Sequence, residues 1–229
     1  MHILGALYDL DGTLLDTEPL YDEAEQKLIN LYGNGVPLDS ETKQQLLGTP
    51  AIVNCKLLVE KYDVKLTPEQ FEEKRDELLV EPFRNCKFKK GAKEVVHKCK
   101  YELGLKSAIA TGSSRFNFDN KVYNLKEWVN EYIDVVITSD NIKRGKPNPD
   151  IFILAAQELG LRPSDCIVFE DGLPGVKAVI SAGVRIVVAI IEEYQRPSFQ
   201  NLVYDKNKTK LVIINSLEEF DFSLISKKK

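Results

Sequence analysis

The sequence predicts an α/β fold in which a parallel sheet carries an inserted α-helical domain. Short apolar runs recur along the chain, helical patterns lie between them, and the stretch at about 18–85 contains helical patterns alone. Strands buried on both faces are apolar throughout, so these runs suit a parallel sheet, and the helices between them supply right-handed crossovers. With 229 residues, the chain is long enough for one domain that carries an insert.

Six apolar runs are the expected strands of this sheet. They lie at 3–8, 107–110, 133–137, 166–169, 185–189 and 211–214. Helices of the same unit are expected at about 91–103, 118–131, 149–159 and 173–182. Gly104 and Gly160 follow two of these helices, as C-terminal caps do, and Pro149 stands where a first helical residue would.

The stretch from about 18 to 85 contains the expected insert. An amphipathic helix is expected at 19–31, shorter helices at about 40–47 and 51–62, and a fourth helix from Thr67 to about Leu79. Thr67 and the three residues after it provide an N-cap, a first-turn proline and a capping-box partner for the fourth helix. We therefore predict a helical cap domain at 17–84 and a core domain made of 1–16 and 85–229.

The overall charge argues against a nucleic-acid-binding protein. Lys and Arg number 31 and Asp and Glu number 35, so the formal charge is 31 − 35 = −4. The run Lys227-Lys228-Lys229 is expected to be a solvated tail. Because binding to nucleic acid of any sequence depends on neutralising phosphates, no nucleic-acid partner is expected. No stretch approaches the ~18 apolar residues of a membrane span, so no membrane partner is expected either.

The cysteines and histidines limit the chemistry that the chain can perform. The four cysteines have no C-x-x-C spacing, which favours free, mostly buried thiols in a reducing compartment and hence a cytoplasmic protein; they are Cys55, Cys86, Cys99 and Cys166. The two histidines, His2 and His97, are too few for a histidine metal cluster, and a Ser-His-Asp triad is not expected. Acid–base chemistry must therefore come from carboxylates. We expect a monomer.

The segment that follows the first expected strand is acidic. Asp9 and Asp11 stand two residues apart at the carboxyl end of that strand, which is where open parallel sheets bind ligands. Two carboxylates at this edge repel each other unless a cation lies there, and Gly12 permits a sharp turn. We interpret Asp9 as a nucleophile and Asp11 as a general acid/base, with Mg²⁺ bound between them. The alternative is a plain Asp-Gly turn that closes a strand.

The segment Asp9-Leu10-Asp11-Gly12-Thr13 resembles the first motif of the haloacid dehalogenase-like (HAD) hydrolase superfamily. The resemblance implies a Rossmann-like sheet, and most members of this superfamily are Mg²⁺-dependent phosphatases. Three further motifs of the superfamily follow in order, each near the end of an expected strand. The resemblance therefore covers essentially the whole chain.

The second and third motifs contain groups suited to a phosphoryl group. Thr111 resembles the residue that hydrogen-bonds a phosphoryl oxygen in the family, and its hydroxyl with the free N–H groups of Gly112 and Ser113 suits an anion. Lys146 resembles the lysine that neutralises both the nucleophile and the phosphoryl group. It precedes a helix that Asn148 is expected to cap. Taken singly, each segment would also suit a polar surface loop.

The fourth motif, Glu170-Asp171, resembles the metal-binding acids of the family. The resemblance implies that Mg²⁺ is held by the Asp9 carboxylate, the main-chain carbonyl of Asp11 and Asp171, with Glu170 either a further ligand or a hydrogen-bond partner. It also implies that Asp9 forms an aspartyl-phosphate. Asp11 then protonates the leaving alkoxide and later deprotonates the hydrolytic water, while Thr111, Ser113 and Lys146 stabilise the charge on the transferring group.

The cap is expected to enclose the substrate and to exclude water. Gly48 and Thr49 lie in a candidate substrate-contact loop between two cap helices. The alternative is that this loop is an ordinary connection between helices. Glu18, at the first crossing between core and cap, is also a substrate-binding candidate. The crossings themselves, around Thr17 and at 84–90, are the natural hinge.

Within the superfamily, a small helical cap in this position suggests subfamily I. The segments 14–18, 114–119, 145–152 and 215–220 are similar to pseudouridine-5'-phosphatase-like members. The expected partner is a small phosphorylated metabolite, either a sugar phosphate or a nucleoside 5'-monophosphate such as pseudouridine 5'-phosphate.

Four other activities compete with hydrolysis of a phosphomonoester. A β-phosphoglucomutase-like sugar phosphomutase usually has a histidine near the start of the cap, where this chain has Tyr21. A dehalogenase would not need Asp11, and a phosphonatase would need a Schiff-base lysine in the cap. A non-catalytic phospho-ligand or protein-binding module would be favoured by the loss of Asp9 or Asp11, and both are present.

Overall fold

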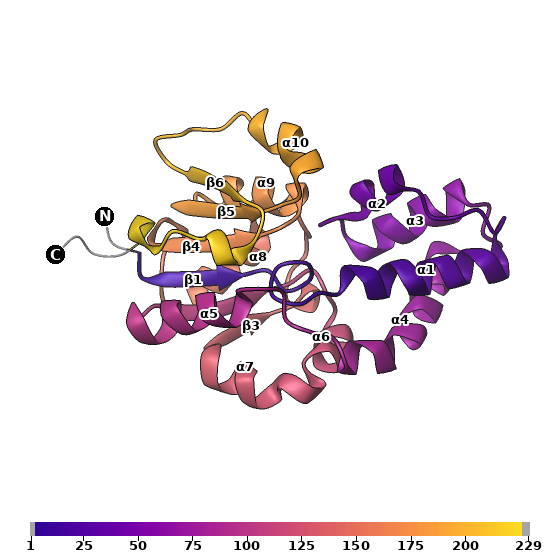
Figure 1. The fold of residues 1–229 in the computed structure, drawn as a ribbon, viewed down its shortest axis with the longest axis horizontal. Coiled ribbons are helices and arrows are strands. Elements are labelled where there is room, and N and C mark those ends of the chain that lie inside the picture. The colour runs from indigo at the N-terminus through magenta and orange to yellow at the C-terminus, as the bar shows by residue number, and fades with distance from the viewer. Residues whose placement is uncertain (1–2, 226–229) are drawn as a thin grey trace.

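The structure, a computed structural model, describes residues 3–225, so the Lys227–Lys229 run and His2 lie outside the described residues. Six parallel strands form one sheet with the order β3-β2-β1-β4-β5-β6 (Figure 1). The strands are β1 (Gly5–Tyr8), β2 (Lys106–Ala110), β3 (Val135–Ile137), β4 (Cys166–Glu170), β5 (Ile186–Ile190) and β6 (Lys210–Ile214). The predicted α/β fold with a parallel sheet is therefore confirmed.

The central strand β1 owes its place to its sequence. All four of its residues are buried, as a strand covered by helices on both faces requires. Tyr8, the last residue of β1, pairs with Ile109 of β2 on one side and with Phe169 of β4 on the other, and β2 and β4 each run one residue further. The turn at Asp9, Thr111 just after β2, and Glu170, the last residue of β4, therefore meet at one edge of the sheet.

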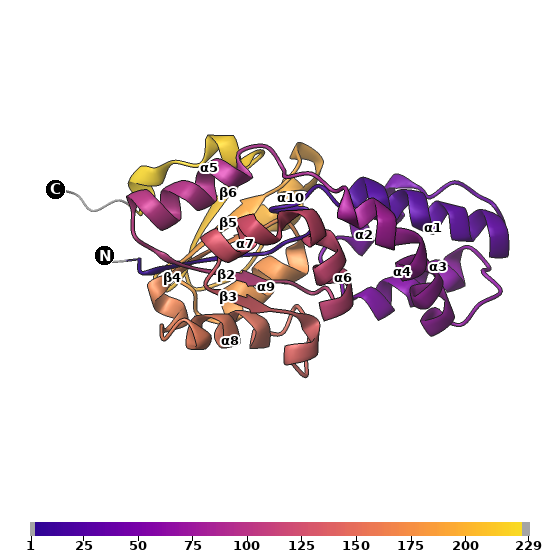
Figure 2. The same cartoon turned by 90° about the horizontal axis from the view of Figure 1, so that it is seen from below.

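Helices cover both faces of the sheet, as Figure 2 shows from below. One face carries α5 (Ala92–His97), α6 (Arg115–Lys121) and α7 (Lys126–Tyr132), and their apolar side chains share a core cluster with Tyr8 and Phe169. The other face carries α8 (Asp150–Glu158), α9 (Leu173–Ser181) and the short α10 (Arg196–Gln200).

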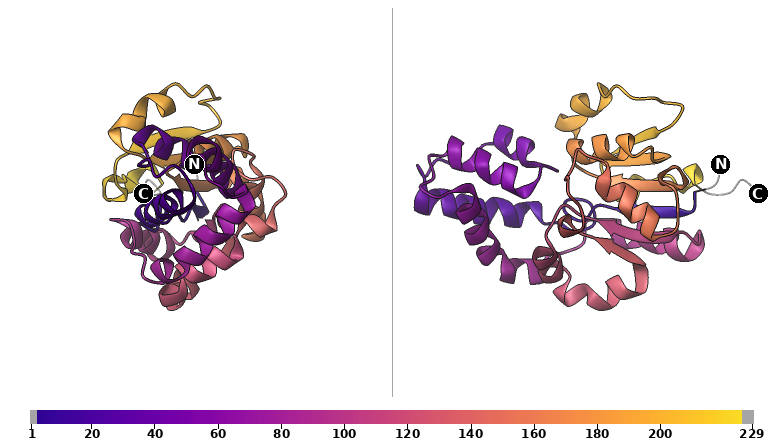
Figure 3. Two further views of the ribbon diagram at one scale, coloured as in Figure 1. Left: turned by 90° about the vertical axis from the view of Figure 1, so that its right-hand side faces the viewer. Right: turned by 180° about the vertical axis from the view of Figure 1, so that it is seen from behind.

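Residues 18–84 form four helices beside this core, at the end toward which β1 points (Figures 1 and 3). They are α1 (Glu18–Tyr32), α2 (Ser40–Leu46), α3 (Ala51–Lys61) and α4 (Pro68–Arg84). Their apolar side chains form clusters of their own, among them Leu28, Ile29, Leu58 and Phe71. The capping box predicted at Thr67 and Gln70 is present at the start of α4.

Three local expectations were wrong. The helix expected at 118–131 is two helices, α6 and α7, separated by a 3-10 turn at Tyr123–Leu125. Asn148 does not cap α8, because its amide donates to the Gly145 carbonyl at 3.0 Å and Pro149 occupies the N-cap position. The helix α4 runs past Leu79 to Arg84.

Other local expectations are confirmed. Gly104 and Gly160 have the positive φ of C-terminal caps, and all four cysteines are free thiols.

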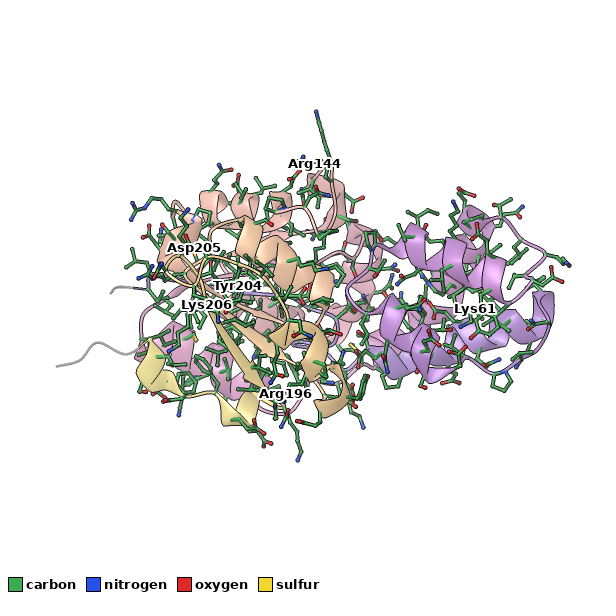
Figure 4. The ribbon with its side chains drawn as sticks, turned by 90° about the horizontal axis from the view of Figure 1, so that it is seen from above. Lys61, Arg144, Arg196, Tyr204, Asp205 and Lys206 are labelled. Atoms are coloured by element: carbon green, nitrogen blue, oxygen red, sulfur yellow. The ribbon has the colours of Figure 1, made fainter. Side chains whose placement is uncertain are left out.

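Buried charges draw attention to two places in the fold. Many charged side chains are exposed: Figure 4 shows Lys61 on the helices of residues 18–84 and Arg144 projecting from the core. Among residues 3–225, six charged side chains are buried, namely Asp9, Glu25, Arg75, Lys121, Lys146 and Glu170. Burying a charge costs free energy unless it is paired, so each of these charges needs a partner. Glu25 and Arg75 pair within the helices of 18–84, and the other four gather at the carboxyl end of the sheet.

None of the helices in residues 3–225 has the length and apolar character needed to cross a lipid bilayer.

Candidate active site

The turn after β1 is built by its own backbone. Gly12 has φ +74°, a conformation that suits glycine, and its N–H donates to the Leu15 carbonyl at 2.9 Å. The N–H groups of Leu14 and Leu15 both donate to the Leu10 carbonyl. The chain therefore curls tightly after Asp9.

Asp9 is paired with a buried lysine. The Lys146 ammonium donates to Oδ1 of Asp9 and to Oε1 of Glu170, both at 2.5 Å. The second oxygen of Glu170 accepts the Gly172 N–H at 2.5 Å, so both oxygens of this carboxylate are engaged. A Cβ at Gly175 would lie 1.7 Å from Oε1 of Glu170, so only glycine leaves room for this carboxylate. The structure thus brings together the predicted residues Asp9, Lys146 and Glu170.

Three carboxylates at this edge could hold a metal ion. Asp9, Glu170 and Asp171 each offer an oxygen, and these oxygens lie within 4.8 Å of one another. Thr13 orients Asp171 through a hydrogen bond of 3.0 Å from its hydroxyl to Oδ1. Carboxylate oxygens are the ligands that hard divalent cations such as Mg²⁺ prefer, so the donor set fits the predicted ion. The Asp11 carboxylate is not part of this group, so the cation expected between Asp9 and Asp11 stays a prediction, with the main-chain carbonyl of Asp11 as the ligand that the resemblance implies.

The acidic group is electrostatically strained without a cation. Burial raises the pKa of Asp9 to about 7, the neighbouring charges of Glu170 and Asp11 add to the rise, and Lys146 opposes it. Burial, Glu170 and Asp9 raise the pKa of Asp171 well above its usual range as well. Burial by itself would lower the pKa of Lys146, but the charges of Asp9 and Glu170 raise it above the ordinary lysine value. A divalent cation at this place would relieve the repulsion among the carboxylates.

Mg²⁺ is therefore expected to stabilise the protein more at high pH than at low pH. An unfolded Asp loses its proton near pH ~4, whereas burial raises the pKa of Asp9 to about 7 in the fold. The metal-free protein should accordingly lose stability as the pH rises through this window, and at low pH protons should compete with the ion. At about pH 8, saturating Mg²⁺ should raise Tm by roughly 5 °C or more, with a smaller shift at about pH 5.

Thermal unfolding with Mg²⁺ or with a chelator at both pH values measures this effect. Asp171→Asn should reduce the shift, whereas Asp63→Asn, on an exposed turn, should leave it unchanged. An equal shift at both pH values would contradict this assignment of the ion to the acidic group.

The turn glycine offers a second test. A Cβ at Gly12 would lie 2.1 Å from Oδ2 of Asp171, whereas a Cβ at Gly104, where φ is +66°, would meet nothing within 4 Å. Alanine at either position carries the cost of a left-handed backbone, about 1–2 kcal/mol. Only Gly12→Ala should displace Asp171, and a misplacement of this size should lower kcat by about 10²-fold. The rate of phosphate release and the Tm of the two alanine variants test this prediction. Equal activities of the two variants would show that the contact with Asp171 does not matter for activity.

The second motif lies beside Asp11. Thr111 is buried at the end of β2, and its hydroxyl accepts the Ser113 N–H at 3.1 Å, so this N–H is not free as the sequence suggested. The Gly112 N–H has no hydrogen-bond partner in the part of the chain that the structure describes. The Ser113 hydroxyl donates to Oδ2 of Asp11 at 2.7 Å. In this arrangement, Thr111 and Ser113 hold Asp11, and the Gly112 N–H stays available.

Sequence reasoning missed Lys121, which pairs with Asp11. Its ammonium donates to Oδ1 of Asp11 at 2.5 Å, and the Thr17 hydroxyl donates to the same oxygen at 2.7 Å. Burial alone would raise the pKa of Asp11, but the charge of Lys121 and the hydrogen bonds from Lys121, Thr17 and Ser113 lower it. Nothing in the segment Arg115–Lys121 marks this lysine as buried, because α6 carries polar residues on several sides.

The cap candidates lie at the rim of this site. Gly48 packs on Gly172, since a Cβ at Gly48 would lie 2.9 Å from the Gly172 Cα. The Thr49 hydroxyl donates to the Gln45 carbonyl at 3.0 Å, within its own loop. Glu18 is half-buried, with Oε2 4.0 Å from the Lys89 ammonium, and burial raises its pKa. The loop at 48–49 thus reaches the turn after β4, which contains Asp171.

The chain resembles known proteins over most of its length. A family profile described as "Haloacid dehalogenase-like hydrolase" matches residues 6–189. A probable pseudouridine-5'-phosphatase from Saccharomyces cerevisiae is 31% identical over 81% of this chain and 81% of that protein. A phosphorylated carbohydrates phosphatase from Thermotoga maritima is 30% identical over 82% of this chain and 85% of that protein.

Solved structures agree with these relatives. CbbY from Rhodobacter sphaeroides, in complex with phosphate, superposes with a TM-score of 0.76 at 25% identity, over 95% of this chain and 96% of that one. A β-phosphoglucomutase from Clostridium difficile superposes with a TM-score of 0.78 at 21% identity, over 97% and 95% of the two chains, which shows a shared fold alone. The matches confirm the resemblance that the four motifs predict, and the chain belongs to the haloacid dehalogenase-like hydrolase family.

Proposed function

We propose that this protein is a Mg²⁺-dependent phosphatase that hydrolyses a small phosphomonoester through an aspartyl-phosphate on Asp9. One observation carries the proposal: Asp9 stands at the end of β1, bonded to Lys146, in one group with Asp171, and two residues before Asp11. A nucleophile, a cation, a metal-binding acid and an acid/base group in this order suit phosphoryl transfer. The family match and the phosphatase names of the relatives support it.

The proposed reaction has two steps. Asp9 attacks phosphorus, the bond to the leaving oxygen breaks, and protonated Asp11 gives its proton to that oxygen. Water then attacks the phosphorus, Asp11 takes a proton from it, and the bond to Asp9 breaks to release phosphate. Lys146 and the Gly112 N–H would stabilise the charge that develops on the phosphoryl oxygens, where preorganised donors contribute most.

The carboxylates of Asp9 and Asp171 and the main-chain carbonyl of Asp11 would hold the ion. When bound, Mg²⁺ would neutralise charge between the nucleophile and the phosphoryl group. We assign Glu170 to orienting Lys146 and the Gly172 backbone, because both of its oxygens are engaged there. The four helices at 18–84 would act as the cap, with Gly48, Thr49 and Glu18 at its substrate face.

The substrate class is a sugar phosphate or a nucleoside 5'-monophosphate such as pseudouridine 5'-phosphate. The names of the relatives from yeast and Thermotoga support these two groups. A sugar phosphomutase is the second candidate, since a β-phosphoglucomutase shares the fold. Tyr21, at the start of the cap, offers no imidazole for proton transfer and favours hydrolysis. We propose further that the protein is a cytoplasmic monomer.

An assay that follows both products separates the candidates. Release of inorganic phosphate is measured over sugar phosphates and nucleoside monophosphates with Mg²⁺ present, beside isomerisation of β-glucose 1-phosphate. We expect Mg²⁺-dependent phosphate release from at least one group. Conversion of the sugar phosphate without free phosphate would identify a mutase. No reaction with any compound would favour a non-catalytic binding module.

A further inference from the structure

Lys121 touches both the core site and the cap. Its side chain is 0% exposed, and its ammonium donates to Oδ1 of Asp11 at 2.5 Å and to the Ser113 hydroxyl at 2.6 Å. On the opposite side, the same ammonium donates to the Tyr21 hydroxyl of α1 at 3.0 Å and lies 4.6 Å from the centre of the Phe83 ring of α4. These contacts use the three N–H groups of the lysine and join it to two cap helices.

Asp11 is held on both of its oxygens. Oδ1 accepts from Thr17 and Lys121, and Oδ2 accepts from Ser113 at 2.7 Å and from Thr111 at 3.4 Å. A carboxylate has about four lone-pair positions, so this one has no free position at which to carry a proton or to accept one from water. Asp11 must give up one of these bonds when it transfers a proton.

We propose that Lys121 is a positioning residue that sets the orientation of the Asp11 carboxyl group according to where Tyr21 and Phe83 of the cap stand. The inference rests on the proposed function, in which Asp11 transfers protons. Lys121 keeps all of its protons throughout. The proton that reaches the leaving oxygen comes from Asp11, and the proton that Asp11 regains comes from water. A shift of α1 against the core moves the Tyr21 hydroxyl, and with it the partner that fixes the ammonium.

If Lys121 had a purely structural role, its removal would have different kinetic effects. If Lys121 only neutralised a buried carboxylate, its removal would lower stability and change every reaction of the enzyme alike. A residue that acts through Asp11 affects the steps in which Asp11 transfers a proton and has no effect once Asp11 is removed. A double-mutant cycle measures this difference directly.

The test compares Lys121→Met, Asp11→Asn and the double variant by single-turnover formation of the phosphoenzyme. An alkyl phosphate, whose leaving oxygen needs a proton, is set beside p-nitrophenyl phosphate, whose leaving group does not. Lys121→Met should lower the rate of phosphoenzyme formation about 10²-fold for the alkyl phosphate and by only a few-fold for p-nitrophenyl phosphate. The substrate concentration that gives half of the maximal rate should change little. In the Asp11→Asn background, Lys121→Met should change either rate by less than about 2-fold.

Two further variants serve as a control and as a test of the contact with the cap. Lys126→Met replaces an exposed lysine whose ammonium lies 5.0 Å from the Tyr123 ring centre, and it should leave both rates unchanged. Tyr21→Phe removes only the hydroxyl that Lys121 reaches, and it should act in the same direction as Lys121→Met with a smaller loss for the alkyl phosphate. Additive losses in the cycle, or equal losses for the two leaving groups, would overturn the proposal.

A measurement that does not depend on turnover can test the role of Lys121 even if the proposed function is wrong. NMR of ¹⁵N-labelled lysine ammonium groups should show Lys121 as a slowly exchanging signal, assigned by its loss in Lys121→Met. That signal should shift in Asp11→Asn and in Tyr21→Phe. If no compound releases phosphate, the proposed function fails while this contact is still measured. A signal unchanged in both variants would overturn the proposal even in an active enzyme.

Discussion

Asp9→Asn is expected to lower kcat by at least about 10⁴-fold, because an amide cannot form the covalent intermediate. The substitution keeps the shape of the side chain and removes one of the carboxylates grouped with Glu170 and Asp171. The fold should therefore survive, since Lys146 keeps its second partner, Glu170. Phosphate release on the best substrate of the wild-type protein measures the loss, and Tm shows that the variant is folded.

Asp119→Asn is the matched control for this experiment. Asp119 lies on the exposed side of α6, 3.0 Å from Arg115, and has no part in the site. It should retain the activity of the wild-type protein. If Asp9→Asn were folded and retained more than about a tenth of the wild-type kcat, the covalent mechanism would be wrong.

Lys146→Met is expected to have the second-largest effect, on activity and on stability together. Lys146 is 7% exposed and bonds both Asp9 and Glu170, so its removal leaves two buried carboxylates without the cation that they share. Removing one partner from such a buried group costs about 3–5 kcal/mol. The loss of a charged donor to the phosphoryl group should also lower kcat by about 10³-fold.

The stability loss should depend on pH. Burial raises the pKa of Asp9 and Lys146 opposes this rise. Without the ammonium the Asp9 carboxyl group favours protonation further, so the variant should recover part of its stability as the pH falls toward about 5. Urea unfolding at several pH values, with Lys143→Met of the same loop as an exposed control, measures this trend. A loss of stability that is the same at every pH would mean that the buried carboxylates are not its cause.

Local patterns were sufficient to predict the sheet and the acidic motifs. The run before Asp9 is apolar on both faces because helices cover both faces of β1, and the turn at Gly12 needs a residue that accepts φ +74°. Each motif follows a strand, and the parallel order of β2, β1 and β4 brings Thr111, Asp9 and Glu170 to one edge. These features depend on neighbours in the sequence and on the general geometry of parallel sheets.

The partners of Asp11 could not be predicted in this way. Lys121 is 110 residues away from Asp11 in the chain, and its burial results from the packing of α6 against α1 and α4. The sequence does not mark the break between α6 and α7 either, because the segment before Lys126 continues the helical pattern of 118–131 without a proline or glycine. Contacts between distant segments bury Lys121, and a single sequence does not record them.

The most direct test of the account is to trap the covalent intermediate. The protein is mixed with its best substrate and Mg²⁺, quenched in acid within the first turnovers, digested, and analysed by mass spectrometry. We predict a single added phosphoryl group on the peptide that contains Asp9, absent in Asp9→Asn and absent when a chelator replaces Mg²⁺. A protein that releases phosphate at its normal rate with no phosphoryl group on Asp9, or with the group on another residue, would contradict the account.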